Sequence, residues 1–143
     1  MGEATELRVE RLRWAGPLAV LASVAAVAVI RETAVVVVRP DARFMPLLRP
    51  FPIFDTAVLG TAAVLVFARF CRDNAHPIAD YRSLAIRVLL ISFVPDMLLA
   101  MTNAFGGGWA EALWLMVMHV AVWTICITVL PAAVAVRTPR HRT

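Results

Sequence analysis

Residues 109–136 read WAEALWLMVMHVAVWTICITVLPAAVAV and contain one acidic residue, Glu111, and one histidine, His119. The hydrocarbon core of a bilayer is about 30 Å thick, and about 20 helical residues are needed to cross it. Three further apolar runs, long enough or nearly long enough to do so, occupy residues 14–38, 53–70 and 81–101. The sequence therefore predicts a single domain that crosses a membrane four times as helices.

The composition excludes an ordinary soluble protein. Hydrophobic residues make up 61% of the 143 residues, whereas globular domains contain about 45–50%. Only short connections and tails remain outside the four runs, so we expect neither a second domain nor an extramembrane enzyme. The formal net charge of +4 does not indicate nucleic-acid binding, because that function needs a basic face on a soluble fold.

Arginine supplies all 14 basic residues and indicates the orientation, because connections rich in Arg or Lys stay in the cytoplasm. With four crossings, one side carries three groups: Arg8, Arg11 and Arg13; Arg69, Arg72 and Arg82; and Arg137, Arg140 and Arg142. The other side carries Arg39, Arg43 and Arg49. We therefore predict that both termini are cytoplasmic and that the tail Arg137, Arg140 and Arg142 binds anionic lipid headgroups.

The first run resembles a secretory signal in its early part, because arginines precede it and a small-residue site lies near its middle. The apolar region of such a signal has about 7–15 residues, and this run continues to residue 38. An uncleaved helix is therefore favoured over a cleaved signal. Its residues Ala15, Ala19, Ala22 and Ala26 have a spacing that lets a neighbouring helix approach closely.

The connection 39–52 contains four prolines, so we expect no regular helix there. Its apolar side chains predict a loop at the membrane interface, and a lid over the helices is the alternative. In the second run, Thr56 and Gly60 form a small-residue face suited to helix packing. Asp55 lies near the start of this run, where a carboxylate can cap a helix.

The third run contains a polar cluster of Ser92, Pro95 and Asp96. A proline removes one helical hydrogen bond, so we expect a kink beside this carboxyl group. Pro77 suits the first turn of the same helix. Ser92 and Asp96 are four residues apart and share a helical face, on which we also expect Asn103.

Asp96, His119 and Ser92 are the candidate polar site inside the membrane. At a rise of about 1.5 Å per residue, Asp96 lies about 21 Å along the third span and His119 about 15 Å along the antiparallel fourth span, so their depths agree within one or two turns. Ionisable groups inside a bilayer usually face the protein interior and find partners. The site is then either a hydrogen-bonded contact that fixes two helices or a proton or cation site, and the remaining alternative is no contact.

A second charged group gathers toward the outer side and comprises Arg31, Glu32, Asp55 and Glu111. With Asp96 and the nearby His119, these four residues of the outer half are a candidate outer vestibule for a cation or a cationic substrate. Ordinary roles are the alternative, because Glu111 can cap its helix and Arg31 can reach the membrane interface.

Several kinds of site lack their residues in this sequence. A haem between helices would need two intramembrane histidines, but His76 and His141 lie outside the runs. The motifs HExxH, CxxC, P-loop and GxSxG are absent, and Cys71 and Cys126 are expected at different depths. We therefore expect no catalytic residues, no metal, no cofactor and no disulfide.

Three strings resemble a family of small bacterial four-helix integral membrane proteins: TAVLGTAAVLVFARF at 56–70, SLAIRVLLISFVPDMLLA at 83–100 and EALWLMVMHVAVWTICITVLP at 111–131. The shared cues are Ser92 followed by Pro95 and Asp96, and the pair Met118 and His119. The resemblance implies a four-span fold in the bacterial cytoplasmic (inner) membrane. It implies no reaction, because that family has no assigned activity.

The expected fold is all-α, an antiparallel four-helix bundle in the membrane. The favoured function is a structural or accessory membrane protein, acting as a homo-oligomer or with a partner membrane protein. The alternative is a small proton- or cation-linked transporter that uses Asp96 and His119. An enzyme acting on lipid, with His119 as base and Asp96 orienting it, is the weakest hypothesis because no nucleophile or metal site accompanies the pair.

Overall fold

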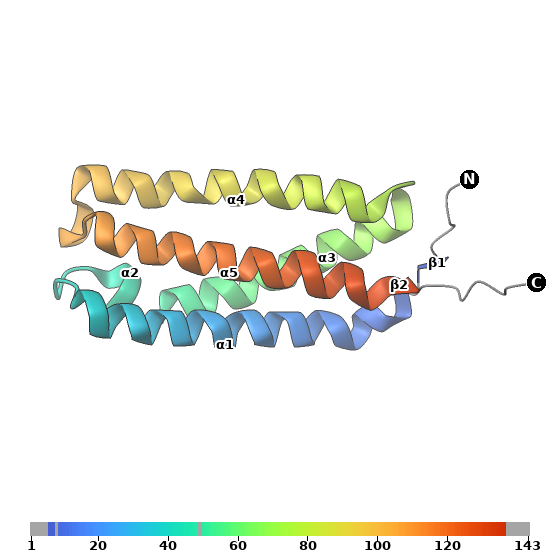
Figure 1. The fold of residues 1–143 in the computed structure, drawn as a ribbon, viewed down its shortest axis with the longest axis horizontal. Coiled ribbons are helices and arrows are strands. Elements are labelled where there is room, and N and C mark those ends of the chain that lie inside the picture. Colours follow the sequence, from blue (N-terminus) through green and yellow to red (C-terminus); the bar gives the residue numbers. More distant parts are fainter. Residues whose placement is uncertain (1–5, 8, 49, 137–143) are drawn as a thin grey trace, which may run out of the picture.

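The structure is a computed structural model and describes residues 6–7, 9–48 and 50–136. Four long α-helices account for most of these residues (Figure 1). The elements, in chain order, are β1 (Glu6–Leu7), η1 (Val9–Arg11), α1 (Leu12–Val38), α2 (Met45–Leu48), α3 (Phe51–Asp73), α4 (Pro77–Thr102), η2 (Ala104–Gly106), α5 (Trp109–Val134) and β2 (Ala135–Val136). The expected all-helical fold with four long apolar helices is confirmed.

Consecutive long helices run in opposite directions, side by side (Figure 1). Helix α1 packs against α3 and α5, and α4 packs against α5 and α3. One end of the molecule holds the end of α1, the short helix α2 and the start of α3, and we call it the α2 end. The opposite end, where β1 and β2 pair, is called the β end.

Some helices begin or end at residues other than the ends of the apolar runs. Helix α4 begins at Pro77 as predicted, but α5 ends at Val134 because Ala135 and Val136 pair with Glu6 and Leu7 as a short antiparallel ladder. The sequence did not predict this ladder.

The proline-rich connection 39–52 also differs from the prediction, because part of it is regular helix. The expectation of none there is wrong for α2 (Met45–Leu48) and for the start of α3 at Phe51. Pro46 and Pro52 each lie in a first helical turn, where the missing N–H has no helical partner to lose.

Two apolar clusters form the core. The cluster toward the β end contains Leu12, Ala19, Phe67, Tyr81, Cys126, Leu130 and Val134. The cluster toward the α2 end contains Val27, Ala34, Phe44, Leu47, Leu115 and Met118. Phe44 and Leu47 are fully buried, so the segment around α2 closes this end of the core with apolar side chains.

Helices α1 and α3 approach closely through small residues. A Cβ atom on Gly16 would lie 2.6 Å from Cγ1 of Val64, and one on Gly60 would lie 3.6 Å from a methyl group of Val20. Thr56 is also buried, as expected for the small-residue face of α3. Ala22 does not belong to the packed face of α1 and is exposed, because buried residues recur every four positions, at Ala15, Ala19, Ser23 and Val27.

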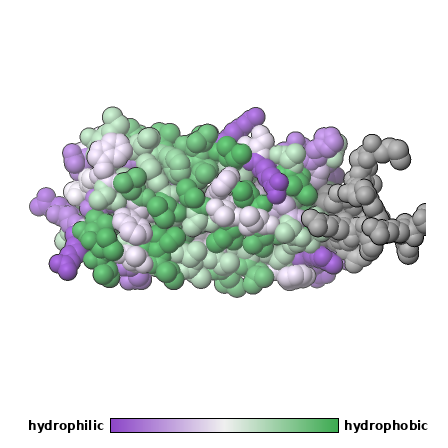
Figure 2. All heavy atoms as spheres, viewed as in Figure 1, coloured by the Kyte–Doolittle hydropathy of each residue, from purple (hydrophilic) through white to green (hydrophobic). Residues whose placement is uncertain are grey.

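The outer surface of the helices is apolar. Large side chains such as Val36, Phe54 and Ile91 are exposed by 72%, 68% and 69%. In Figure 2 hydrophobic residues cover most of the middle of the visible face, and hydrophilic residues gather mainly near its ends. All four long helices are long and apolar enough to cross a membrane.

Candidate functional site

A groove lies between α3 and α4, with α5 as its floor. Its cavity volume is about 490 Å³, which is within the usual range of small-molecule sites. Most of the lining side chains are apolar. The polar members are Asp55 and Thr56 from α3, Tyr81, Ser92 and Asp96 from α4, and His119, Trp123 and Cys126 from α5.

The groove exists because α3 and α4 meet at the β end and separate toward the α2 end (Figure 1). At the β end the rings of Phe67 and Tyr81 pack with centroids 4.7 Å apart. Toward the α2 end, α3 leans on α1 through Gly60 and Val20. The side chains of α5 between these helices therefore remain partly uncovered.

Asp96 and His119 touch at the wall of this groove. Nδ1 of His119 lies 3.2 Å from Oδ2 of Asp96 and 2.9 Å from the carbonyl oxygen of Leu115. Only the Leu115 contact has hydrogen-bond geometry, and since a carbonyl can only accept, it requires a proton on Nδ1. The sequence left open whether Asp96 and His119 touch, and the structure brings them into contact.

The carboxyl group of Asp96 is buried without full hydrogen bonding. Its side chain is 7% exposed, and Oδ2 forms no hydrogen bond with any residue that the structure describes. The His119 side chain is 37% exposed and lies edge-on to Phe93, with ring centroids 6.4 Å apart. His119 is thus the more open member of the pair, and Asp96 lies deeper.

Ser92 lines the groove but does not bond to the pair. Its hydroxyl donates to the carbonyl of Leu89 at 2.7 Å, within its own helix. Asn103 does not share the groove, because it ends α4 in the left-handed conformation and is exposed. Helix α4 continues through Pro95 to Thr102.

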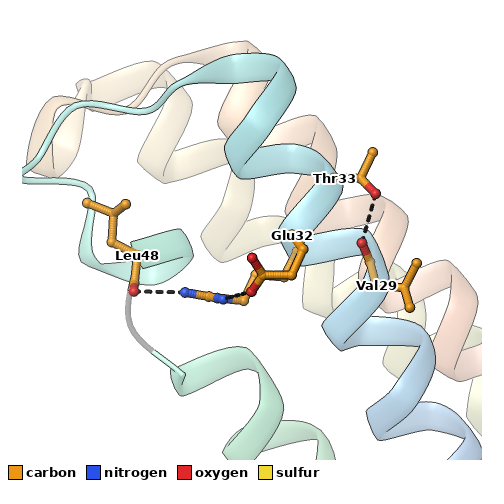
Figure 3. Close-up of polar contacts among 5 residues, drawn as sticks. Val29, Glu32, Thr33 and Leu48 are labelled. Carbon is orange, nitrogen blue, oxygen red and sulfur yellow. Dashed lines mark hydrogen bonds and ion pairs between the residues drawn. The ribbon is translucent and has the colours of Figure 1, made fainter.

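The four residues expected to form an outer vestibule do not gather at one site. Arg31 pairs with its neighbour Glu32, and its guanidinium donates to the carbonyl of Leu48 at 2.8 Å (Figure 3). Arg31 therefore ties the end of α2 to α1. Neither Arg31 nor Glu32 lines the groove, which runs between other helices.

Glu111 and Asp55 also have separate surroundings. Glu111 accepts a hydrogen bond from the backbone N–H of Gly108 at 2.8 Å, as expected for a residue that caps α5. Asp55 lines the groove near the α2 end. It does not cap α3, because that helix begins four residues earlier, at Phe51, after Pro50.

Sequence reasoning did not identify Trp123, Tyr81 or Cys126 as groove residues. Trp123 and Cys126 are four and seven residues after His119, a spacing that places all three on one face of α5 and was the available signal. The indole N–H of Trp123 is buried without a hydrogen-bond partner. The groove therefore contains two polar atoms, Oδ2 of Asp96 and Nε1 of Trp123, that accept or donate no hydrogen bond among the described residues.

The predicted lipid-binding tail, Arg137, Arg140 and Arg142, lies outside the described residues. Among residues 6–7, 9–48 and 50–136, no group of three His, Cys, Asp or Glu side chains is placed to hold a metal ion. Both cysteines, Cys71 and Cys126, are free thiols.

Comparisons with protein-family models, with curated proteins and with solved structures find no match to this chain. The chemistry of the site therefore rests on its own geometry. A carboxyl group beside an imidazole can take up and release a proton, and an apolar groove around them can hold a small molecule.

Proposed function

We propose that the protein is a multi-pass protein of the bacterial cytoplasmic membrane that works as a small proton- or cation-linked transporter through Asp96 and His119. The four apolar helices support membrane insertion. Among the described residues, Arg11, Arg13, Arg69, Arg72 and Arg82 belong to the β end, and Arg31, Arg39 and Arg43 to the α2 end. This bias supports a cytoplasmic β end, and therefore cytoplasmic termini.

The observation that carries the proposal is the buried carboxyl group of Asp96 beside His119 in the groove. A buried polar atom without a hydrogen bond costs free energy, of the order of 1–3 kcal/mol and more when charged. A residue that only joined two helices would gain most from full hydrogen bonding. Oδ2 of Asp96 instead has its 3.2 Å contact with His119 and no hydrogen bond among the described residues, as expected for an atom that receives a proton or a ligand.

A structural or accessory role is the second candidate. Asp96 and His119 belong to α4 and α5, which pack extensively, so their contact also joins two helices. The exposed apolar faces of the helices suit a second copy or a partner membrane protein as well as lipid. In this role the pair contributes stability and no flux.

Flux measurements with Asp96→Asn separate the two candidates. The protein is reconstituted into phosphatidylethanolamine and phosphatidylglycerol vesicles that contain a pH-sensitive dye, and Na⁺, K⁺ or organic cations are added outside. We expect a cation-dependent change in internal pH with the native protein and none with Asp96→Asn, since the amide cannot exchange a proton.

Glu32→Gln is the matched control, because it removes an exposed carboxylate that does not line the groove. This variant keeps the flux. Absence of flux in the native protein for every cation, together with a lower unfolding temperature of Asp96→Asn in detergent, favours the structural role.

The proposed orientation has a separate test. Single cysteines are placed at Asn74, in the connection at the β end, and at Asp41, in the connection at the α2 end, in a background with Cys71 and Cys126 replaced by Ser. A membrane-impermeant maleimide added to intact cells is expected to label the cysteine at position 41 alone. Labelling at position 74 alone would reverse the orientation.

A further inference from the structure

The charge of the groove is opposite to that of the chain. The formal net charge is +4 and all basic residues are Arg, yet the described residues that line the groove include no arginine. Its acidic members are Asp55 near the α2 end and Asp96 deeper in the groove. Two carboxyl groups against one imidazole give the groove an acidic balance, which attracts a positive charge.

Aromatic side chains complete this environment. Phe51, Tyr81 and Trp123 line the groove, and aromatic faces attract cations, most strongly in a desolvated site. Most of the remaining lining is aliphatic. A strongly hydrated inorganic ion gains little from such walls, whereas an organic cation with an apolar body can bury that body there.

The groove also opens sideways. Leu59 on α3 and Val88 on α4 both line it, and they are 64% and 56% exposed on the outer surface. In a bilayer this opening faces the lipid chains, in which an apolar cation is already concentrated. The entrance therefore lies between α3 and α4.

We infer that the groove binds lipophilic organic cations that enter from the bilayer between α3 and α4, and that each cation displaces a proton from the Asp96 and His119 pair. This inference rests on the proposed function and names its substrate class. When the cation binds, one proton leaves the pair, from whichever residue held it, so the net charge of the site is unchanged.

The groups that face Asp96 are few. His119 on α5 is in contact, Asp55 on α3 lines the same groove, and α1 contributes only Val27 to the lining. Ser92, Thr56, Tyr81, Cys126 and Trp123 are the other polar side chains of the lining. No described basic side chain besides His119 is placed there to neutralise Asp96 in place of a ligand.

Binding of tetraphenylphosphonium tests the inference, with tetraphenylborate as a ligand of the same shape and opposite charge. Calorimetry on the purified protein in detergent is expected to show binding of the phosphonium alone. A pH indicator in weak buffer is expected to show release of about one proton per bound cation. In the native protein, affinity therefore rises by up to about tenfold per pH unit over the range in which the pair loses this proton.

The variant Asp96→Asn is expected to weaken phosphonium binding by about 30-fold or more, because the buried partner of the positive charge is lost. Glu32→Gln, outside the groove, retains native affinity. No phosphonium binding, equal binding of the borate, affinity independent of pH in the native protein, or unchanged affinity in folded Asp96→Asn would each overturn the inference. The three outcomes measured on the native protein apply even when Asp96→Asn does not fold.

Flux and binding measurements together distinguish a wrong substrate class from the absence of transport. Vesicle flux driven by Na⁺ or K⁺ and abolished by Asp96→Asn, without phosphonium binding, retains the transporter and rejects the substrate class. Phosphonium binding with proton release but without any flux retains the site and rejects the transporter.

Discussion

Phe44 occupies the space that a β-carbon on Gly107 would need. Such an atom would lie 2.1 Å from Cε2 of Phe44, far inside van der Waals contact. Phe44 is fully buried, so its ring has little room to move. The connection between α4 and α5 thus passes directly over the segment that precedes α2, and the α2 end of the core depends on a residue without a side chain.

Gly107→Ala is expected to lower the free energy of unfolding by about 1–3 kcal/mol, the usual cost of overpacking a core. Thermal unfolding in detergent, followed by circular dichroism, measures the change. Gly108→Ala is the control, because its Cβ would lie 3.6 Å from Glu111, an ordinary contact. Equal stability of the two variants would contradict the close approach of Phe44.

The interface between α1 and α3 offers a matched pair of glycines. Gly16→Ala places a Cβ 2.6 Å from Val64, whose β-branched side chain is stiff in a helix, so a loss of about 1–3 kcal/mol is expected. Gly60→Ala meets Val20 at 3.6 Å and gains helix propensity, so its stability is expected to be equal or higher by up to about 1 kcal/mol.

A second substitution, Val64→Ala, tests whether the collision with Val64 is the reason that Gly16→Ala lowers stability. In the double variant Gly16→Ala with Val64→Ala, the methyl groups that collide are absent. Unfolding in detergent is expected to show that the double variant loses less than the sum of the single variants, as a double-mutant cycle requires for residues in contact. Strict additivity would mean that the two residues do not meet.

Arg31→Ala is expected to loosen α2. Its guanidinium donates to the carbonyl of Leu48, and without it this end of α2 loses its link to α1 (Figure 3). Hydrogen exchange measured by mass spectrometry is expected to be faster over residues 44–48, because local opening needs less free energy. Thr33→Ala is the control, since its hydroxyl donates only to Val29 in the same helix, and it should leave exchange in that segment unchanged.

The packing of Phe67 against Tyr81 fixes α3 to α4 at the β end of the groove. Tyr81→Ala is expected to cost about 3–5 kcal/mol of stability, as for other buried aromatic residues cut to alanine. Tyr81→Phe keeps the ring and its packing against Phe67, so it is expected to cost less than about 1 kcal/mol. Chemical unfolding in detergent checks both variants, and a large loss in Tyr81→Phe would indicate a polar role for the hydroxyl.

The sequence predicts the four helices well because the length of an apolar run reflects a simple requirement of the bilayer. It also places Asp96 and His119 at similar depths, from helical rise and antiparallel order, but leaves open whether they touch. The length of an apolar run does not reveal short helices or short ladders. The sequence therefore did not predict α2 or the pairing of Glu6–Leu7 with Ala135–Val136.

The groove was beyond prediction for a different reason. It depends on how far α3 leans from α4 toward α1, through contacts such as Gly60 with Val20, which involve residues distant in the sequence. The outer vestibule was expected from depth alone. Depth does not determine the direction in which a side chain points, and Arg31 points to Leu48 rather than to the groove.

The ladder between β1 and β2 holds the residues before α1 beside the residues after α5. A circularly permuted chain, joined at these strands and opened at Ala75 in the connection between α3 and α4, would keep every helix beside its present neighbours. Each helix would also keep its direction, because the junction and the new ends both lie at the β end. The order of the four helices along the chain is therefore separable from their arrangement in space.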